Sequence, residues 1–510
     1  MVELEKIPHL DEISHHGVFQ GVRPKNTATF RQRTVAHNKL VPSLEEAIRR
    51  TGLKDGMTIS FHHHFRNGDH VLNMVVDTLA RMGYKNLTLA ASSLAAVHAP
   101  LIEHIKAGVI THIETSGLRG ELAEQVSRGL MDCPVVFRSH GGRAAAISSG
   151  DLHIDVAFLG APSCDPYGNA NGYSRDDDDS IACGSLGYAR TDAKYADNVI
   201  VITSNVVNYP NAPWAIPEDD VDYIVKVDDI GDPKGIMSGA TRYTKNPKEL
   251  LIAETAANVI EAAGYLYDGF SMQMGSGGAS LAAARFLREK MLAQHIHCRF
   301  ALGGITGQIA AMHEEGLIDR ILDVQSFDVD AALSLKKNHF HHQISASYYA
   351  SPLASAAVDQ LDFVILSALE IDTDFNVNVL TGSDGVIRGA IGGHPDTAEG
   401  ASLSVVVGPL TRGRIPTIID HVNTVVTPGA TVDVVVTDQG VAVNPNRPEV
   451  AQKLKKAGIR VYTIQQLKEK AEALVGKPDP IRYLDRIVGV VMYRDNTILD
   501  VIRQIDETEA

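Results

Sequence analysis

The segment Ile154–Asn171, IDVAFLGAPSCDPYGNAN, is repeated in outline 207 residues later as Leu361–Asn378, LDFVILSALEIDTDFNVN. Six of the 18 aligned positions are identical. Each segment begins with an apolar run typical of a buried strand and continues into Asp and Asn residues that favour turns. The pair therefore predicts that one strand-and-turn unit occurs twice in the chain.

Two further matches lie upstream in the same order. Gly108–Ile113 (GVITHI) aligns with Gly316–Ile321 (GLIDRI) at an offset of 208, and Asp55 and Gly56 align with Asp268 and Gly269 at an offset of 213. The three offsets differ by only a few residues, as insertions in loops would cause. Three matches in one order indicate two copies of one domain.

The pattern around these matches is that of an α/β fold. The β-branched run MTISF (57–61) precedes a helical pattern, HVLNMVVDTLARMG (70–83), and a second strand-like run, NLTLAAS (86–92). Strand, helix, strand predicts mainly parallel sheets covered by helices. The sequence therefore predicts two similar α/β domains.

The domain boundaries follow from breaks in this pattern. Residues 1–45 show little periodicity and are expected to form an N-terminal extension. IGDPKG and TKNPKE supply Pro, Gly and charge near residues 230–246. We therefore expect a first domain over residues 46–235 and a second over residues 246–510.

Composition excludes several classes of protein. With 510 residues, 44% of them hydrophobic and 21% charged, the chain is neither a small stapled scaffold nor a disordered polymer. Its 47 basic and 62 acidic residues give a net charge of −15, which disfavours non-specific binding to nucleic acid or to anionic lipid. The first twelve residues, MVELEKIPHLDE, lack the layout of a secretory signal, and the four cysteines are isolated. We expect a cytoplasmic protein.

A carboxylate marks the end of the repeated strand in the second copy. Glu370 follows the apolar run, whereas Ser163 occupies the matching position in the first copy. Loops at the carboxyl ends of parallel strands commonly carry the chemistry of such folds, so Glu370 is a candidate functional residue; the alternative is a solvated loop residue. Asp372 matches Asp165, and a shared turn-capping role suits both better than catalysis does.

Two glycine-rich stretches are candidate binding loops. Gly275, Ser276, Gly277 and Gly278 follow an expected strand and open a helix, so their amides can bind a phosphate or another oxyanion; an ordinary turn is the alternative. The second stretch, residues 387–401, contains Gly392 and Gly393. These would let the backbone approach a ligand closely, unless the stretch is a tight connection between strands.

Histidines cluster at residues 62–64 and 339–342, which suggests a metal site. Adjacent histidines on a strand point to opposite faces, however, so three in a row do not converge on one ion without a bulge. We expect no metal site. A polar wall facing an anionic substrate is the better functional interpretation of the first cluster.

Seven segments together resemble the coenzyme A-transferase superfamily, and most closely its citrate lyase α-chain branch, across nearly the whole chain. The segments are DGMTISF, IDVAFLGAPSCDPYGNANG, DGFSMQMGSGGA, EEGLIDRILDVQSFD, SALEIDTDFNVNV, GAIGGHPDTAEGA and VVTDQGVAVNP. GGHPDTAEGAS and the closing RIVGVVMYRDNTILDVIRQ are characteristic of the citrate branch.

The resemblance implies a citrate CoA-transferase that exchanges acetate for citrate on the thioester of an acyl carrier protein, giving citryl thioester. The implied partners are the carrier γ chain, with its phosphoribosyl-dephospho-CoA arm, and a β chain that cleaves citryl thioester. No metal, nicotinamide or covalent cofactor is implied for this chain. The alternatives are a stand-alone CoA-transferase that uses free acetyl-CoA and a non-catalytic ligand sensor.

The resemblance also assigns candidate roles to residues. The superfamily's attacking glutamate carries over onto Glu370, either as a covalent nucleophile or as a group that positions citrate. Gly392 and Gly393 are candidates to hold the oxyanion and, with the first glycine loop, the acyl-carrier arm. The candidate ligands for citrate carboxylates, each of which is alternatively a surface charge, are Arg66, Lys336, Arg388 and His394.

Overall fold

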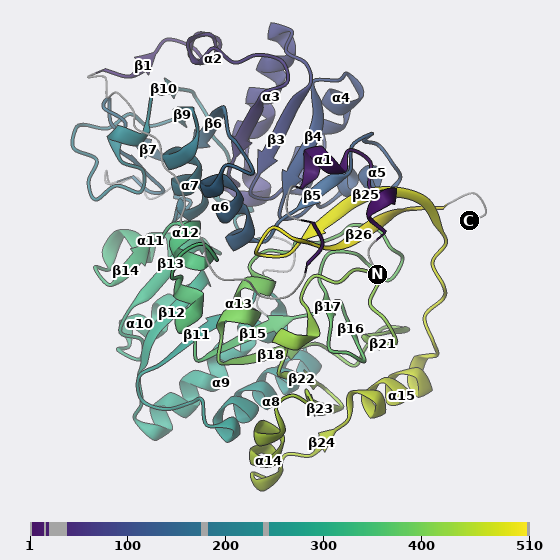
Figure 1. Cartoon of the computed structure of the whole chain (residues 1–510). Helices are drawn as coiled ribbons and strands as arrows, with labels where there is room; N and C mark the ends of the chain where they lie inside the picture. Colours follow the sequence, from purple (N-terminus) through teal and green to yellow (C-terminus); the bar gives the residue numbers. More distant parts are fainter. Residues whose placement is uncertain (1–2, 15–16, 20–37, 175–181, 238–243, 507–510) are drawn as a thin grey trace.

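The computed structural model describes residues 3–14, 17–19, 38–174, 182–237 and 244–506. It contains two α/β halves packed against each other, the first drawn in purple to teal and the second in green (Figure 1). Each half is built on one large sheet. Both sheets consist mainly of parallel strands, which confirms the predicted fold class.

The first half contains a ten-stranded sheet in which all neighbouring strands are parallel except the last pair. Its apolar side chains are buried because helices cover both faces of its central part. In spatial order the strands are β1 (Leu40–Val41), β10 (Tyr223–Lys226), β9 (Asn198–Thr203), β6 (Val156–Gly160), β2 (Thr58–Phe61), β3 (Leu87–Ala91), β4 (Ile110–Thr115), β5 (Val135–Phe137), β25 (Tyr483–Met492) and β26 (Ile498–Ile505).

The second half contains a nine-stranded sheet with one antiparallel pair, β22 and β23. Its spatial order is β14 (His341–Gln343), β13 (Ile321–Ser326), β12 (Cys298–Ile305), β11 (Phe270–Met274), β15 (Phe363–Ser367), β18 (Leu403–Val407), β22 (Val434–Thr437), β23 (Gly440–Val443) and β24 (Val461–Tyr462). The order β5-β4-β3-β2-β6-β9-β10 of the first sheet thus recurs as β14-β13-β12-β11-β15-β18-β22. This shared topology confirms the duplicated unit.

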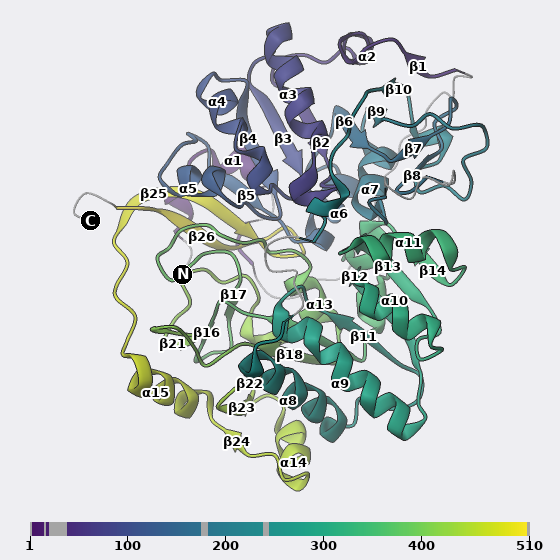
Figure 2. The same cartoon turned by 180° about the vertical axis from the view of Figure 1, so that it is seen from behind.

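Four helices lie between the two sheets and join the halves: α6 (His140–Ser149), α7 (Gly187–Tyr195), α12 (Ala346–Ala350) and α13 (His394–Gly400). Outer helices cover the far faces, as the view from behind shows for α8 and α9 (Figure 2). The remaining α-helices are α1 (Leu10–Ile13), α2 (Leu44–Thr51), α3 (Val71–Met82), α4 (Leu101–Lys106), α5 (Glu121–Ser127), α8 (Pro247–Ala263), α9 (Gly278–Gln294), α10 (Gly307–Glu314), α11 (Val329–Lys337), α14 (Pro448–Lys456) and α15 (Ile464–Val475). Within the described ranges, no helix combines the length and apolar character that crossing a membrane requires.

The repeated turns are held by similar hydrogen bonds in both halves. Asp165 Oδ1 accepts from the amides of residues 167–169, and Asp372 Oδ1 accepts from those of Asp374 and Asn376. Each turn connects two short strands: β7 (Ser163–Cys164) with β8 (Ala170–Asn171), and β16 (Glu370–Asp372) with β17 (Val377–Asn378). The expected turn-capping role of the two aspartates is thereby confirmed. The other short strands are β19 (Thr411–Arg412), β20 (Ile415–Pro416) and β21 (Ile418–Ile419).

The expected domain boundaries are wrong at both ends of the chain. The hairpin of β25 and β26 belongs to the first sheet, where β25 pairs with β5, so the second domain does not extend to residue 510. At the other end, β1 and α2 already belong to the first half, which shortens the extension. Ile7 and Ile13 of the extension pack against this hairpin. The edge strand of a sheet can pair with a segment from a distant part of the chain. The local sequence of that segment does not specify which sheet it joins.

Candidate active site

A cavity of about 530 Å³ lies between the halves. The loops that follow β2, β3 and β4 line it from the first half, and those that follow β11, β13 and β15 line it from the second. The carboxyl ends of both sheets therefore meet at this cavity, as expected for ligand sites in parallel α/β folds. No acidic side chain of the described residues lines it.

The first half contributes side chains with hydrogen-bond donors. Arg66 and Arg119 line the cavity together with His63, His140 and Tyr188. Burial lowers the pKa of Arg66 to about 10, helped by the positive charge of Arg119, and burial also lowers the pKa of Arg119. Guanidinium groups remain charged at such values at neutral pH, so this wall is positively charged.

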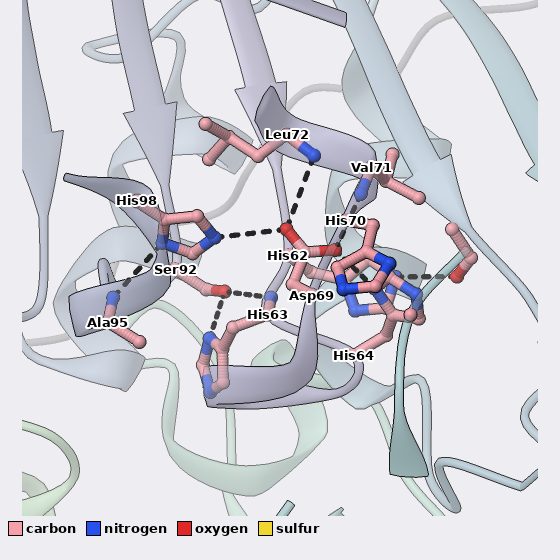
Figure 3. Close-up of polar contacts among 12 residues, drawn as sticks. His62, His63, His64, Asp69, His70, Val71, Leu72, Ser92, Ala95 and His98 are labelled. Atoms are coloured by element: carbon pink, nitrogen blue, oxygen red, sulfur yellow. Dashed lines mark hydrogen bonds and ion pairs between the residues drawn. The ribbon is translucent and has the colours of Figure 1, made fainter. Parts of the chain in front are cut away.

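The ring of His63 points away from those of His62 and His64, whose centroids lie 5.3 Å apart (Figure 3). His62 Nε2 donates to the Gly160 carbonyl at 3.0 Å, His63 contacts Ser92, and His64 Nδ1 lies 3.2 Å from Asp69. The three therefore do not share one ion, and the interpretation of the cluster as a polar wall applies to His63, which lines the cavity. A group with spacing suited to a metal, among the described residues, is formed elsewhere by His153, Asp155 and Asp197 at the surface.

Asp69 anchors the loop that carries His63 and Arg66. Its carboxylate accepts from the amides of Val71 and Leu72 at the start of α3. It also accepts from His98 Nε2 at 3.0 Å, because His98 Nδ1 already accepts the amide proton of Ala95 (Figure 3). Backbone and imidazole donors together keep this buried carboxylate ionised, lowering its pKa against the effect of burial.

His63 is a neutral hydrogen-bonding group at the cavity wall. Its pKa lies well below the usual value, first because it is buried and then because Arg66 is nearby. Ser92 Oγ accepts the His63 amide proton at 3.1 Å and lies 2.5 Å from His63 Nδ1. This pair of contacts to one hydroxyl restrains the imidazole.

The second half contributes mainly backbone to the cavity, and its one charged lining residue among those described, Arg388, pairs with Asp384. Gly275, Ser276 and Gly277 line the cavity after β11, and Gly392 and Gly393 line it before α13. Gly392 has φ of +59°, and a Cβ added to Gly393 would lie 2.4 Å from the Tyr349 hydroxyl. Within the described residues, the amides of Gly392 and Gly393 donate to no protein acceptor. They are therefore available to a ligand oxyanion.

The expected site residues are only partly brought together. Arg66, Arg388, His394 and the glycines 275, 277, 392 and 393 line the cavity with Ser276. Gly278, at the first turn of α9, and Lys336, on α11, are not part of its lining. Arg388 is half-exposed and pairs with Asp384, so its charge is already compensated.

His394 lines the cavity but uses both ring nitrogens inside the protein. Nε2 donates to the Ser367 carbonyl at 3.0 Å, and Nδ1 accepts from the Thr427 hydroxyl at 2.6 Å. Burial lowers its pKa to about 4, so the ring is neutral at physiological pH. These contacts suit a residue that fixes the glycine loop better than one that binds a carboxylate.

Glu370 lies one residue beyond the cavity wall, next to Leu369, which lines the cavity. It is 3% exposed. Its Oε1 accepts from Asn423 Nδ2 at 2.8 Å, and its Oε2 accepts from Asn378 Nδ2 at 2.8 Å and from the Asn423 amide at 3.2 Å. Burial raises its pKa, and these three donors oppose the rise.

Sequence reasoning missed Arg119, His140 and Tyr188. Each is an isolated residue without a motif, and Arg119 lies in the loop that follows β4. Its position depends on contacts across the seam: the Ile391 amide donates to the Ser116 carbonyl at 2.7 Å, and the Leu118 amide donates to the Gly389 carbonyl at 3.1 Å. Such long-range pairing has no local signature.

The buried histidines predict that acid destabilises the protein. Burial lowers the pKa of His62 and His140 to about 3 and that of His394 to about 4, and it also lowers the pKa of His63 and His64. In the unfolded chain these histidines bind protons below about pH 6.5, whereas in the folded chain they remain neutral there. The free energy of unfolding therefore keeps its full value above that pH. Below it, the free energy of unfolding falls by up to about 1.4 kcal/mol per pH unit for each histidine. Burial also raises the pKa of Asp396, to about 6, and those of Glu370, Asp433 and Asp500, which opposes this effect.

Urea denaturation at pH 7.5 and 5.5 tests this prediction. We expect a lower midpoint at pH 5.5, and a smaller pH effect in the His394→Gln variant, whose side chain is never protonated. His339→Gln, a change at an exposed histidine, is the matched control and should keep the wild-type pH effect. Equal midpoints for the wild type at both pH values would contradict the prediction.

Comparison with known proteins agrees with this geometry. The model of the family "Citrate lyase, alpha subunit (CitF)" matches residues 37–505. The chain is 58% identical over 480 residues to the citrate lyase alpha chain of Escherichia coli (strain K12), covering 94% of this chain and 93% of that one. It is 56% identical over 492 residues to that of Klebsiella pneumoniae, covering 96% of each.

Solved structures show the same relationship. The alpha subunit of citrate lyase from Streptococcus mutans, solved in complex with citrate, superposes with a TM-score of 0.92 at 56% identity and 96% coverage of both chains. A malonate decarboxylase alpha subunit from Acinetobacter baumannii shares the fold, with a TM-score of 0.62 at 14% identity, covering 87% of this chain and 94% of that one. The chain belongs to the citrate lyase alpha subunit family.

Proposed function

We propose that this chain is the transferase subunit of citrate lyase and that its inter-half cavity exchanges acetate for citrate on an acyl thioester. The observation that carries the proposal is the contrast between the two walls. Arginines and neutral histidines face the cavity from the first half, and glycine amides without protein acceptors face it from the second. Such a cavity suits an anionic acid that must react with a thioester carbonyl.

The proposed reaction begins when a carboxylate oxygen of citrate attacks the acetyl carbonyl carbon. A C–O bond forms, the C–S bond breaks, and the thiolate then attacks the citryl carbonyl of the mixed anhydride, releasing acetate. Each addition places negative charge on a carbonyl oxygen. In this proposal the Gly392 and Gly393 amides donate to that oxygen, and removal of one such donor commonly costs ~10²–10³ in rate.

Glu370 supports this site from behind the cavity wall. Its carboxylate binds Asn378 and Asn423, and the backbone after Asn378 leads to Val379, which lines the cavity. In the proposed mechanism Glu370 holds in position the part of the cavity wall that contains Leu369 and Val379. The alternative role, an enzyme-bound glutamyl thioester, requires its side chain to turn toward the cavity.

The acyl donor in the proposed reaction is the acetylated phosphoribosyl-dephospho-CoA arm of an acyl carrier γ chain, and a β chain cleaves the citryl product. The amides and hydroxyl of the Gly275–Gly277 loop would bind polar groups of the arm. Arg66 would bind citrate, whereas the charge of Arg388 is already paired with Asp384 and Lys336 is not part of the cavity lining.

The purified chain tests this function when it is incubated with acetyl-CoA, or with acetylated carrier protein, and isotopically labelled citrate. We expect acetate release and labelled citryl thioester in equal amounts. Borohydride reduction followed by peptide mass spectrometry then tests Glu370, because only an enzyme-bound thioester converts it to the alcohol. Binding of citrate without acetate release would reject the transferase function in favour of a ligand sensor.

A further inference from the structure

Arg119 has a feature that the proposed function does not explain. It lines the cavity, its side chain is partly buried, and its Nη1 donates to Ser93 Oγ at 3.4 Å. No acidic group among the described residues forms an ion pair with it. Burying a charge without a partner is costly, and proteins do so mainly where a ligand supplies the opposite charge.

A second guanidinium faces the same space. Arg66 Nη1 donates to the Ile236 carbonyl at 2.8 Å, and its guanidinium carbon lies 5.2 Å from the centre of the Phe327 ring, on the opposite half. The backbone of Arg66 has φ of +53°, a conformation that costs free energy in a residue with a side chain. Two like charges are thus kept close together, one of them on a strained backbone, in a cavity whose described lining contains no carboxylate.

The other polar groups of this wall do not add charge. The pKa of His63 is lowered well below its usual value and that of His140 is lowered to about 3, in both cases chiefly by burial, so both rings are neutral at physiological pH. Arg388, which lines the cavity from the second half, pairs with Asp384. The charge that the first half presents to a ligand is therefore that of Arg66 and Arg119.

The position of Arg119 relative to the glycine amides is restrained by the backbone. The Ser116 carbonyl accepts from Ile391, next to Gly392, and a Cβ on Gly117 would lie 2.2 Å from that of Ala390. The loop that carries Arg119 therefore packs against the loop that carries the two candidate oxyanion donors. A ligand bound to Arg119 is kept within reach of those amides.

We propose that Arg119 and Arg66 each bind one carboxylate of the same citrate molecule, so that the third carboxylate is left to react near Gly392 and Gly393. This assignment rests on the proposed function and extends it to the basis of substrate choice. Arg119 is then a specificity-determining residue: it favours an acid with two carboxylates besides the reacting one over a monocarboxylate such as acetate. Bidentate geometry makes an arginine better suited to this role than a lysine.

The test measures citrate affinity and transfer in Arg119→Gln and Arg119→Lys variants of the full chain. Arg119→Gln should raise the citrate Kd, measured by titration calorimetry, and the citrate KM by ~30–100-fold, with a much smaller change in kcat. Arg119→Lys keeps the positive charge but lacks the planar guanidinium group. Its citrate Kd and KM should therefore lie between those of the wild type and those of Arg119→Gln. Exchange of labelled acetate into acetyl-CoA, which needs no second carboxylate, should change less than about threefold.

Arg190→Gln is the matched control, because Arg190 is also a largely desolvated arginine but binds the Gln343 carbonyl outside the cavity lining. It should leave the citrate Kd unchanged. Melting temperatures identify a variant that fails to fold, in which case the lysine variant carries the test. A citrate Kd within threefold of wild type in every folded Arg119 variant overturns the assignment, whereas a wild-type chain that neither binds citrate nor exchanges acetate overturns the proposed function itself.

Discussion

Glu370→Gln is expected to lower acetate release by at least ~100-fold. Both oxygens of the Glu370 carboxylate accept hydrogen bonds, and the three partners from Asn378 and Asn423 are all donors. A glutamine amide presents one acceptor and one donor, so its NH₂ group meets another donor and leaves a buried polar contact unsatisfied. The segments that carry Asn378 and Asn423 should then shift, together with the cavity wall at Leu369 and Val379.

The measurement is steady-state acetate release, with the melting temperature recorded in parallel. Glu114→Gln is a matched control, because Glu114 is a largely buried carboxylate that pairs with Arg138 at 2.6 Å, away from the cavity. It should lower stability and leave kcat near wild type. Turnover like that of the wild type in Glu370→Gln would remove Glu370 from the site.

Gly393→Ala is the second change with a large expected effect, again a loss of ~100-fold or more in kcat. The added Cβ would lie 2.4 Å from the hydroxyl of Tyr349, a fully buried ring whose hydroxyl accepts from Gln273 Nε2 at 2.9 Å. A ring in a packed core moves little, so the backbone at Gly393 has to move instead. That movement displaces the amides of Gly392 and Gly393 from the cavity.

A second substitution separates this mechanism from general destabilisation. Tyr349→Phe removes the atom that the new Cβ meets first, leaving the next ring atoms at 3.2 Å, so the double variant should recover much of the lost kcat. Gly408→Ala is the control, because a Cβ there has neighbours at ordinary distances of 3.6 and 3.8 Å. Equal losses in the single and double variants would contradict the steric explanation.

The repeat was predictable because its turns are built from local interactions. Asp165 and Asp372 bind amides two to four residues further along the chain, so the residues that form each turn remain visible as a motif. The apolar strands before them are equally local. The α/β class of both halves and their mainly parallel strands followed from these patterns.

The rest depended on contacts between distant segments. Nothing near His394 indicates that Ser367 and Thr427 occupy its ring, which is why a ligand role was expected. Glu370 was placed correctly after a strand, but the asparagines that bind its carboxylate come from the paired strand β17 and from a loop 53 residues away. The C-terminal hairpin was predicted to belong to the second half, which precedes it in the sequence. Strand propensity indicates that a segment forms a strand but not which sheet edge it pairs with.

The return of β25 and β26 to the first sheet has a consequence for biosynthesis. Translation reaches residues 483–505 only after the whole second half has been made, so until then β5 is an open edge. During this part of translation the nascent chain exposes the unpaired backbone N–H and C=O groups of β5. Exposed strand edges of this kind promote aggregation. The first half is therefore expected to fail as an isolated fragment, and a nonsense codon that deletes only the last thirty residues should damage the half encoded first.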